Sequence, residues 1–266
     1  MDEYLNKNLD MWNDWAPLHA ESEFYDVEGF KNGRNTLDSI ELEEVGDVTG
    51  KSLLHLQCHF GMDTLSWARL GARVTGIDFS DKAIDIACSL SKEMGIKADF
   101  ICCNIYDLPE NLTGTFDIVY TSAGVLGWLP DLKQWAEIIY HYLKPGGFFY
   151  ILDSHPFSHV FDDSKDVTEL NVKHSYFHSP EPTKWEIDGS YAGARTDRQY
   201  ISYEWTHSMG DIINSLISSG LRIEFLHEFP VLFFKWFPFM KQDEEGWWRL
   251  EGNRIPLTFS IKATKP

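Results

Sequence analysis

The fold is decided by the stretch SLLHLQCHFGMDTLSWARLGARVTGIDFS, residues 52–80. Residues 52–56 form a short apolar run that is typical of a buried strand, and residues 72–77 repeat this pattern. Residues 63–70 between them are expected to form a short helix, which Gly71 ends because glycine tolerates the backbone that follows many helices. A strand, a helix and a second strand in this order predict a parallel βαβ unit.

The same alternation continues toward the carboxyl terminus. Ser80 is expected to cap a helix, and Ser208 a later one with Asp211 as its capping partner. A helix over residues 132–143 is stopped by the Pro and Gly residues of 144–147. Further strands are expected at residues 98–103, 116–121, 148–152, 222–227 and 256–263. These elements predict an α/β domain in which helices cover both faces of a mostly parallel sheet.

Two segments depart from this alternation. Residues 1–50 are acidic and polar and carry a series of aromatic side chains. Residues 155–204 are polar, are punctuated by His, Pro and Tyr, and contain only short runs with strand character. We interpret the second segment as an insertion, at about residues 155–204, into one α/β domain that spans residues 51–266.

Composition and charge limit the possible partners and location. The 266 residues carry 23 basic and 41 acidic side chains, a net charge of −18, which opposes binding to nucleic-acid phosphates. No apolar run is long enough to span a bilayer, and the amino terminus has no secretory pattern. The four cysteines lack the spacing of a disulfide framework or a zinc site, so we expect a cytoplasmic, reduced protein.

Ligands of such sheets bind beyond the carboxyl ends of the strands, so the turns that follow the strands are the places to examine. Residues 57–61 lead from the first strand into a helix, whose N-terminal N–H groups favour a negatively charged ligand group. Asp78 ends the second strand, where a carboxylate can accept both hydroxyls of a ribose. After the third strand, Asn104 can hold a purine by hydrogen bonds and Ile105 by packing.

An ordered set of five segments now resembles a known family, the class I S-adenosylmethionine-dependent methyltransferases. The resemblance covers about residues 45–155, and LKPGG is its most specific part. The segments are LLHLQCHFGMDTL (53–65), VTGIDFS (74–80), CNIYDLP (103–109), FDIVYTSAGVLGWLPD (116–131) and LKPGGFFYILD (143–153).

The resemblance implies a Rossmann-like, seven-stranded sheet with its last strand antiparallel, and S-adenosyl-L-methionine as the cofactor, converted to S-adenosyl-L-homocysteine. It implies that Asp78 binds the ribose, that Asn104 and Ile105 flank the adenine, and that residues 1–50 form a helical lid. In this lid Trp12, Trp15 and Tyr25 would cover the methionine end of the cofactor. A helix packed onto the sheet is the alternative to the lid. The cofactor-binding residues that it implies are Gln57, Cys58, His59, Gly61, Asp78, Phe79, Asn104, Ile105, Thr121, Ser122 and, from the lid, Trp15 and Tyr25.

The first motif departs from the family pattern, which is usually acid-x-Gly-Cys-Gly-x-Gly. Here His55 replaces the acid, and Gln57 and His59 replace the first two glycines, which leaves Gly61. Three explanations are open: a remodelled but competent site, which the intact later motifs favour, a different cofactor, or a degenerate site. The side chains of His55, Cys58 and His59 are not expected to converge, so no metal site is predicted.

The acceptor side carries fewer signals. His155 follows the fifth strand and His207 precedes the last long helix, so each is a candidate for the general base, with a structural, hydrogen-bonded histidine as the alternative. Trp128 lies in the loop that borders the acceptor in related enzymes, or packs there. Residues 225–239 hold seven aromatic side chains, which favours a pocket wall or a homodimer contact.

These observations predict transfer of a methyl group from S-adenosylmethionine to an oxygen or nitrogen nucleophile of a small molecule. The acidic charge favours a neutral or cationic acceptor over a polyanion. Two alternatives stay open: a non-catalytic ligand-binding protein with the same fold, and an NAD-dependent oxidoreductase. The oxidoreductase requires a Gly-x-Gly-x-x-Gly turn, which the sequence lacks.

Overall fold

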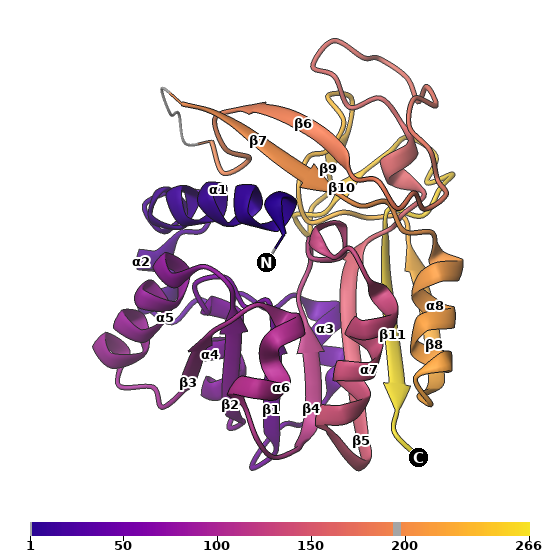
Figure 1. Ribbon diagram of the computed structural model, residues 1–266. Helices are drawn as coiled ribbons and strands as arrows, with labels where there is room; N and C mark the ends of the chain where they lie inside the picture. Colours follow the sequence, from indigo (N-terminus) through magenta and orange to yellow (C-terminus); the bar gives the residue numbers. More distant parts are fainter. Residues whose placement is uncertain (1, 194–197) are drawn as a thin grey trace.

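The computed structural model describes residues 2–193 and 198–266. In these residues a seven-stranded sheet has the order β3-β2-β1-β4-β5-β11-β8 (Figure 1). The strands are β1 (Ser52–Leu56), β2 (Arg73–Asp78), β3 (Asp99–Cys102), β4 (Phe116–Thr121), β5 (Leu143–Ser154), β8 (Arg222–Phe229) and β11 (Thr258–Thr264). Strands β1 to β5 pair in parallel, whereas β11 is antiparallel to both β5 and β8. The predicted sheet, including its antiparallel last strand, is confirmed.

The strand order reverses at β1, which pairs with β2 on one side and with β4 on the other. In the register of these pairs, Leu56 lies opposite Ile77 of β2 and opposite Thr121 of β4. The three strands therefore end at the same level of the sheet. The turns that follow them begin side by side at the topological switch point, where open α/β sheets bind their ligands.

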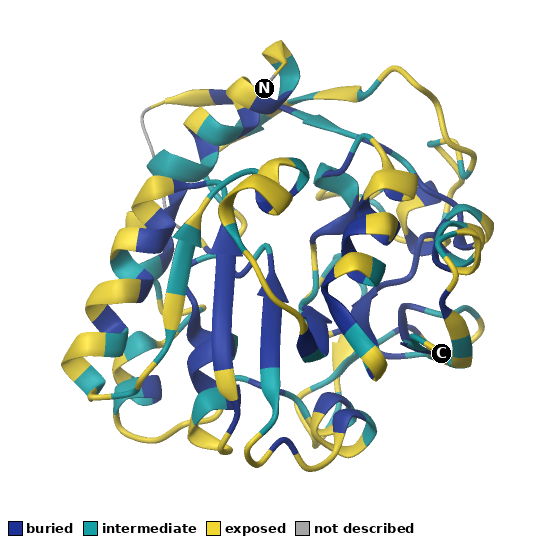
Figure 2. Cartoon of the chain, turned by 60° about the horizontal axis from the view of Figure 1, so that its bottom comes forward, coloured by how far each residue is buried: buried dark blue, intermediate teal, exposed yellow. Residues whose placement is uncertain are grey.

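Helices cover both faces of the sheet, and its central strands are mostly buried, as their dark blue colour in Figure 2 shows. On one face α7 and α8 enclose a core that includes Leu54 and Val119, and on the other α3 and α4 enclose one that includes Leu53 and Tyr120. The helices are α1 (Glu3–Ala20), α2 (Val27–Lys31), α3 (Ser39–Val45), α4 (Met62–Arg69), α5 (Asp81–Met94), α6 (Leu108–Asn111), α7 (Leu132–Tyr142) and α8 (Met209–Ser218). No helix in the described residues is long and apolar enough to cross a membrane.

The largest difference from the expected boundaries concerns β5. This strand begins at Leu143 instead of at residue 148, because Leu143 already pairs with Phe116 of β4. The register then shifts across the glycines of the LKPGG motif. A Cβ atom on Gly147 would lie 2.8 Å from the backbone oxygen of Asp117, so only glycine allows the two strands to approach here. The motif thus forms an irregularity within the strand and does not precede it.

The insertion contains an antiparallel hairpin, β6 (Thr183–Asp188) and β7 (Gln199–Glu204). Figure 1 shows α1 lying between this hairpin and the carboxyl edge of the sheet. Asn8 ties α1 to β7. Its side chain donates to the backbone oxygen of Tyr203 at 2.7 Å and accepts from the N–H of the same residue at 2.8 Å. The helix therefore contacts both the sheet domain and the inserted segment.

The amino-terminal 50 residues do not act as one unit. Helix α3 and its flanks contribute Leu37, Val45 and Val48 to the core on one face of the sheet, far from a lid's position. Only α1 and α2 approach the carboxyl edge of the sheet (Figure 1). The segment available as a lid is therefore shorter than the predicted residues 1–50.

The aromatic residues 225–239 divide in a similar way. The first part extends β8, while Leu232 and Phe237 are fully buried in a separate core with Val160 and Phe161 of the insertion. Short strands β9 (Lys241–Gln242) and β10 (Trp248–Arg249) pair beside this core. Much of the aromatic density is therefore explained by packing inside the chain, although Phe233 remains 37% exposed.

Candidate active site

The turns after β1 and β2 are joined by the carboxylate of Asp78. Its two oxygens accept hydrogen bonds from the backbone N–H groups of His59 and Ser80, each at 2.9 Å. The backbone N–H of Cys58 also donates to the oxygen of Ile77 at 2.8 Å, so the two turns are in direct contact. Burial raises the pKa of Asp78 to about 6, although the backbone N–H donors oppose this shift. A nearly buried carboxylate thus lies at the switch point, as the sequence predicts.

The turn after β1 keeps the backbone geometry of a glycine-rich loop without its glycines. Gln57 has φ 57°, His59 has φ 50° and Gly61 has φ 79°, so all three adopt the left-handed conformation. Residues with a Cβ atom reach this conformation at a cost of about 1 kcal/mol each. At Gly61 a Cβ atom would lie 2.7 Å from the ring of Phe100, so this position admits only glycine. Gln57 and His59 therefore adopt the left-handed backbone that the glycines of the usual motif favour.

His55, which replaces the usual acid, is a buried connector between three elements. Its Nδ1 lies 2.8 Å from Thr64 Oγ1 of α4, and its Nε2 lies 3.0 Å from Ser122 Oγ in the turn after β4. The ring is fully buried, and burial lowers its pKa to about 3, so it is neutral at pH 7. Within residues 2–193 and 198–266, no group of His, Cys, Asp and Glu side chains is placed to hold a metal ion.

Some buried polar atoms in these turns and in α1 lack hydrogen-bond partners. Gln57 Oε1, Thr121 Oγ1 and the indole N–H of Trp15 are buried and have no hydrogen-bond partner among the described residues. Unpartnered buried polar groups are rare in native proteins and call for an explanation. An amino-acid end of a cofactor, with one ammonium and one carboxylate, supplies both a donor for the Gln57 oxygen and acceptors for the other two groups. The residues present therefore fit such a group.

The predicted adenine side lies after β2 and β3. The backbone N–H of Cys103 donates to the backbone carbonyl oxygen of Asp78 at 2.9 Å, which keeps the two strand ends together. Asn104 accepts the N–H of Tyr106 at 2.9 Å through its Oδ1, which leaves its amide nitrogen free for other contacts. Ile105 is buried, and Phe79 and Asn104 are half-buried, so an apolar and a polar group lie next to Asp78.

Helix α1 contacts the loop after β1 through two residues that are two turns apart. The Nδ1 atom of His19 lies 3.0 Å from Nε2 of His59, and the ring of Trp12 lies 5.3 Å from the rings of both His59 and Trp128. Trp15, the predicted contact, instead packs against Tyr200 of the insertion at 6.0 Å. His19 was missed by the sequence reasoning, whereas Trp12 was expected in the lid. The i, i+7 spacing of the two residues, which places them on one helix face, is the signal that could have found His19.

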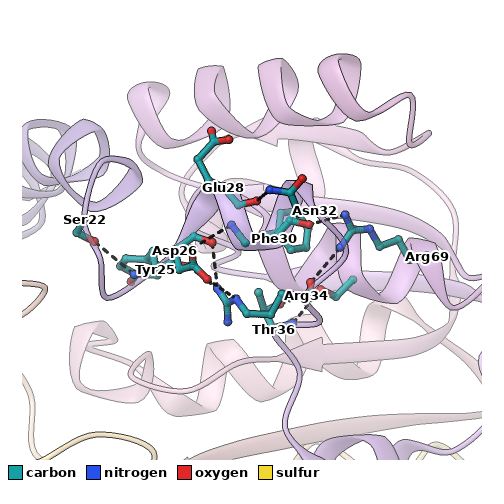
Figure 3. A network of polar contacts seen from close by, with 11 residues as sticks. Ser22, Tyr25, Asp26, Glu28, Phe30, Asn32, Arg34, Thr36 and Arg69 are labelled. Carbon is teal, nitrogen blue, oxygen red and sulfur yellow. Dashed lines mark hydrogen bonds and ion pairs between the residues drawn. The ribbon is translucent and has the colours of Figure 1, made fainter.

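The segment that carries Tyr25 is anchored to α4, as Figure 3 shows. Arg69 donates to the backbone oxygen of Phe30 at 2.7 Å and lies over its ring, while Arg34 pairs with Asp26 at 3.1 Å and donates to the oxygen of Tyr25. The ring of Tyr25 then stacks on His19 and contacts His59. This network therefore holds the Tyr25 ring in place against His19 and His59.

The two candidate bases are held by contacts inside the protein. His155 is nearly buried, its Nε2 lies 2.9 Å from Glu228 Oε1, and its Nδ1 accepts the N–H of Phe157 at 3.0 Å. His207 donates through Nε2 to the backbone oxygen of Leu129 at 2.7 Å. Burial lowers the pKa of both rings, that of His207 to about 4. Both rings therefore make hydrogen bonds within the protein that support its structure. A role of either ring as general base stays a prediction.

Asp153, at the end of β5, organises the loop after β4. It accepts the backbone N–H of Gly124 at 2.6 Å and that of Val125 at 3.3 Å. The indole N–H of Trp128 closes the same loop by donating to the oxygen of Gly124 at 2.8 Å. The loop is therefore held in one position, and it presents the Trp128 ring to α1.

Comparison with known proteins identifies what this arrangement belongs to. The profile of a methyltransferase domain family matches residues 53–147. A ubiquinone biosynthesis O-methyltransferase of Bordetella avium is 31% identical over 185 residues, which cover 67% of this chain and 74% of that protein. The chain belongs to the class I S-adenosylmethionine-dependent methyltransferases. The enzyme therefore uses S-adenosylmethionine as its cofactor, and the oxidoreductase and non-catalytic alternatives are wrong.

Other relatives of this methyltransferase are more distant or match over less of their length. A Bordetella pertussis enzyme of the same name is 34% identical over 121 residues, and the chain spans half of its length. A solved S-adenosylmethionine-dependent methyltransferase of Clostridium acetobutylicum has a TM-score of 0.58 at 14% identity, with 97% of this chain and 98% of that one covered. A glycopeptide N-methyltransferase with sinefungin bound has a TM-score of 0.58 at 17% identity, with 87% of each chain covered. These structures confirm the fold.

Proposed function

We propose that this methyltransferase transfers a methyl group to an oxygen or nitrogen atom of a small molecule. The observation that carries the proposal is the switch point itself, where the buried carboxylate of Asp78, a left-handed loop and the unpartnered Gln57 Oε1 occur in adjacent turns. The names of its relatives, an O-methyltransferase and a glycopeptide N-methyltransferase, support these two types of acceptor atom. The net charge of −18 favours a neutral or cationic acceptor and disfavours a nucleic acid.

The cofactor supplies a methyl group on a sulfonium that is already activated. The chain therefore has to bind and orient the cofactor and the acceptor, and to exclude water. We assign the ribose hydroxyls to Asp78, because a buried carboxylate at the end of β2 accepts two hydrogen bonds well. The ammonium of the cofactor is assigned to Gln57 Oε1, which has no other partner in the described chain. The remaining predicted contacts are Cys58, His59 and Gly61 in the loop, Phe79, Asn104 and Ile105 around the adenine, Thr121 and Ser122 on the methyl side, and Trp15 and Tyr25 above.

Helices α1 and α2 are proposed to be the lid, and residues 155–204 the cap over the acceptor. The contact between His19 and His59 supports the lid, because it joins α1 directly to the cofactor loop. The same His19 ring lies 2.6 Å from Ser190 Oγ of the insertion, so lid, loop and cap meet at one side chain. Closure of these elements would exclude water from the transfer step.

His155 and His207 remain the predicted bases, and alanine substitution of each tests them separately. Loss of a general base lowers kcat by about 100-fold at saturating acceptor and removes one limb of the pH profile. A structural histidine lowers the melting temperature and leaves the shape of that profile as it was. An unchanged kcat for His155→Ala or His207→Ala would exclude that residue as the base.

Location and assembly complete the proposal. The thiols of Cys58, Cys88, Cys102 and Cys103 are all free, which fits a reducing compartment such as the cytoplasm. A homodimer through residues 225–239 is proposed from the exposed Phe233, and its test is the molar mass in solution. A monomeric mass at every protein concentration would exclude this contact.

Calorimetry with S-adenosylmethionine, S-adenosylhomocysteine and NAD tests the core of the proposal. We expect the first two to bind with a stoichiometry of one and NAD not to bind. Methylation is then measured as formation of S-adenosylhomocysteine with phenols, catechols and amines as acceptors. Absence of binding by both sulfur ligands would contradict the proposed function.

A further inference from the structure

The inner face of the β6–β7 hairpin carries polar groups that the proposed function does not use. Tyr200, Ser202 and Glu204 occupy every second position of β7 and therefore share one face, whereas Gln199 and Ile201 on the opposite face are exposed. Tyr200 packs with Met11 and Trp15 of α1, so this face is turned toward the lid and the strand ends. The register places Trp185 of β6 opposite Ser202. Trp185 and Glu204 are thus diagonal neighbours on the inward face.

Glu204 is a half-buried carboxylate without a compensating charge. Its only hydrogen bond in the described chain comes from Ser202 Oγ at 3.4 Å, and no basic side chain of the described residues contributes to its electrostatics. Burial, with the nearby Asp163, raises the pKa of Glu204 to about 7. Removing a carboxylate from water without a cation or several donors is costly, so a missing partner is implied.

Trp185 supplies the opposite kind of group on the same face. Its indole N–H is buried and has no hydrogen-bond partner among residues 2–193 and 198–266. Most buried indole N–H groups in proteins do have one. A carboxylate with one long hydrogen bond and an N–H without an acceptor therefore stand on neighbouring positions, and no hydrogen bond joins them.

The loop after β4 lies directly below these groups. The backbone N–H of Trp205 donates to the oxygen of Gly127 at 2.8 Å, which ties the end of β7 to this loop. A Cβ atom built on Gly127 would come to 4.0 Å from Glu204 Oε2, so the carboxylate stands against the loop's backbone. Trp128 follows, and Thr121 begins the loop on the methyl side of the proposed site. Glu204 therefore lies on the side from which an acceptor would approach.

We propose that Glu204 and Trp185 bind the methyl acceptor, and that the acceptor is a small aromatic molecule with a hydroxyl or amine group. The hydroxyl or amine donates to the Glu204 carboxylate, and an oxygen of the acceptor takes the N–H of Trp185. The indole of Trp185 gives a flat ring apolar surface to lie on. An anionic acceptor is disfavoured, because Glu204 repels it. This inference rests on the proposed function and names its substrate class.

The test is calorimetry on the protein saturated with S-adenosylhomocysteine, with catechol, tyramine and benzoate as probes. Glu204→Gln is expected to weaken catechol and tyramine binding by about tenfold or more, because a charged hydrogen bond is lost, and to tighten benzoate. Glu186→Gln, on the exposed face of the same hairpin, is the matched control and should change none of the three. Trp185→Phe keeps an aromatic ring but removes the N–H, and should weaken catechol binding about fivefold.

The outcomes separate this inference from the function on which it rests. If the wild type does not bind S-adenosylhomocysteine, the proposed function is wrong. If it binds this ligand but neither catechol nor tyramine, or if Glu204→Gln and Glu186→Gln bind them equally, the assignment of the acceptor site is overturned. Should Glu204→Gln unfold, Trp185→Phe decides alone, because unchanged catechol affinity in that variant also overturns it.

Discussion

The cofactor side and the acceptor side of this enzyme are built in opposite ways. On the cofactor side, backbone N–H groups of His59 and Ser80 converge on Asp78, and the residues involved follow one another closely in the sequence. On the acceptor side, single side chains from distant segments meet, such as Trp12 of α1 and Trp128 after β4. The first arrangement is fixed by local backbone geometry. The second depends on how the insertion and α1 are placed, so it can change without disturbing the cofactor site.

The largest expected effect breaks the cofactor side at its centre. Asp78→Asn replaces acceptor-only oxygens with an amide, and it should weaken S-adenosylmethionine binding by about 100-fold, because charged hydrogen bonds to the ribose and loop are lost. Calorimetry measures the change in Kd. Asp81→Asn, at the exposed start of α5, is the matched control and should bind normally. Equal affinity of the two variants would show that Asp78 is not the ribose ligand.

The next effect separates backbone conformation from close packing. Gly61 and Gly95 both have positive φ, but only at Gly61 would a Cβ atom clash, with the ring of Phe100. Gly61→Ala should therefore lower the free energy of unfolding by about 3 kcal/mol, and Gly95→Ala by about 1 kcal/mol. Chemical denaturation measures both values. Similar losses in the two variants would mean that the loop rearranges around the added methyl group.

A smaller effect tests the join between the two sides. His19→Ala removes the contacts with His59 and Ser190 but leaves Asp78 untouched. We expect the dissociation rate of S-adenosylmethionine to rise about tenfold, because lid opening limits release. Stopped-flow fluorescence of the nearby tryptophans measures this rate. His141→Ala, which changes an exposed side chain of α7, should release the cofactor at the wild-type rate. If both variants behave alike, α1 is not a lid.

The smallest effect concerns the pH dependence of stability. The pKa of His55 is about 3 in the folded protein, below the ordinary value of 6.5, so the unfolded chain binds more protons between these limits. His55 therefore stabilises the fold above pH 6.5, and this contribution is lost as the pH falls toward 3. His55→Gln should flatten the melting temperature against pH in this window. An unchanged slope would place the acid sensitivity at other buried histidines.

Most of the fold could be predicted from the sequence, because strand and helix signals are local. The ends of β1, β2 and β4, and with them Asp78 and Thr121, were found from turns next to apolar runs. The start of β5 was missed, because pairing of Leu143 with Phe116 depends on the neighbouring strand. Glu204 and Trp185 escaped notice for the same reason. No local pattern shows that the insertion turns these two side chains inward.

The left-handed backbone of Gln57 and His59 has a consequence for the thermodynamics of cofactor capture. A glycine at either position leaves the free loop with many conformations, and binding then has to order them. Side chains with a Cβ atom narrow that choice in advance, and the Asp78 carboxylate already holds the His59 N–H. The loop therefore meets the cofactor with little conformational entropy left to lose. Part of the cost of ordering has been moved from the binding step to the folding of the chain.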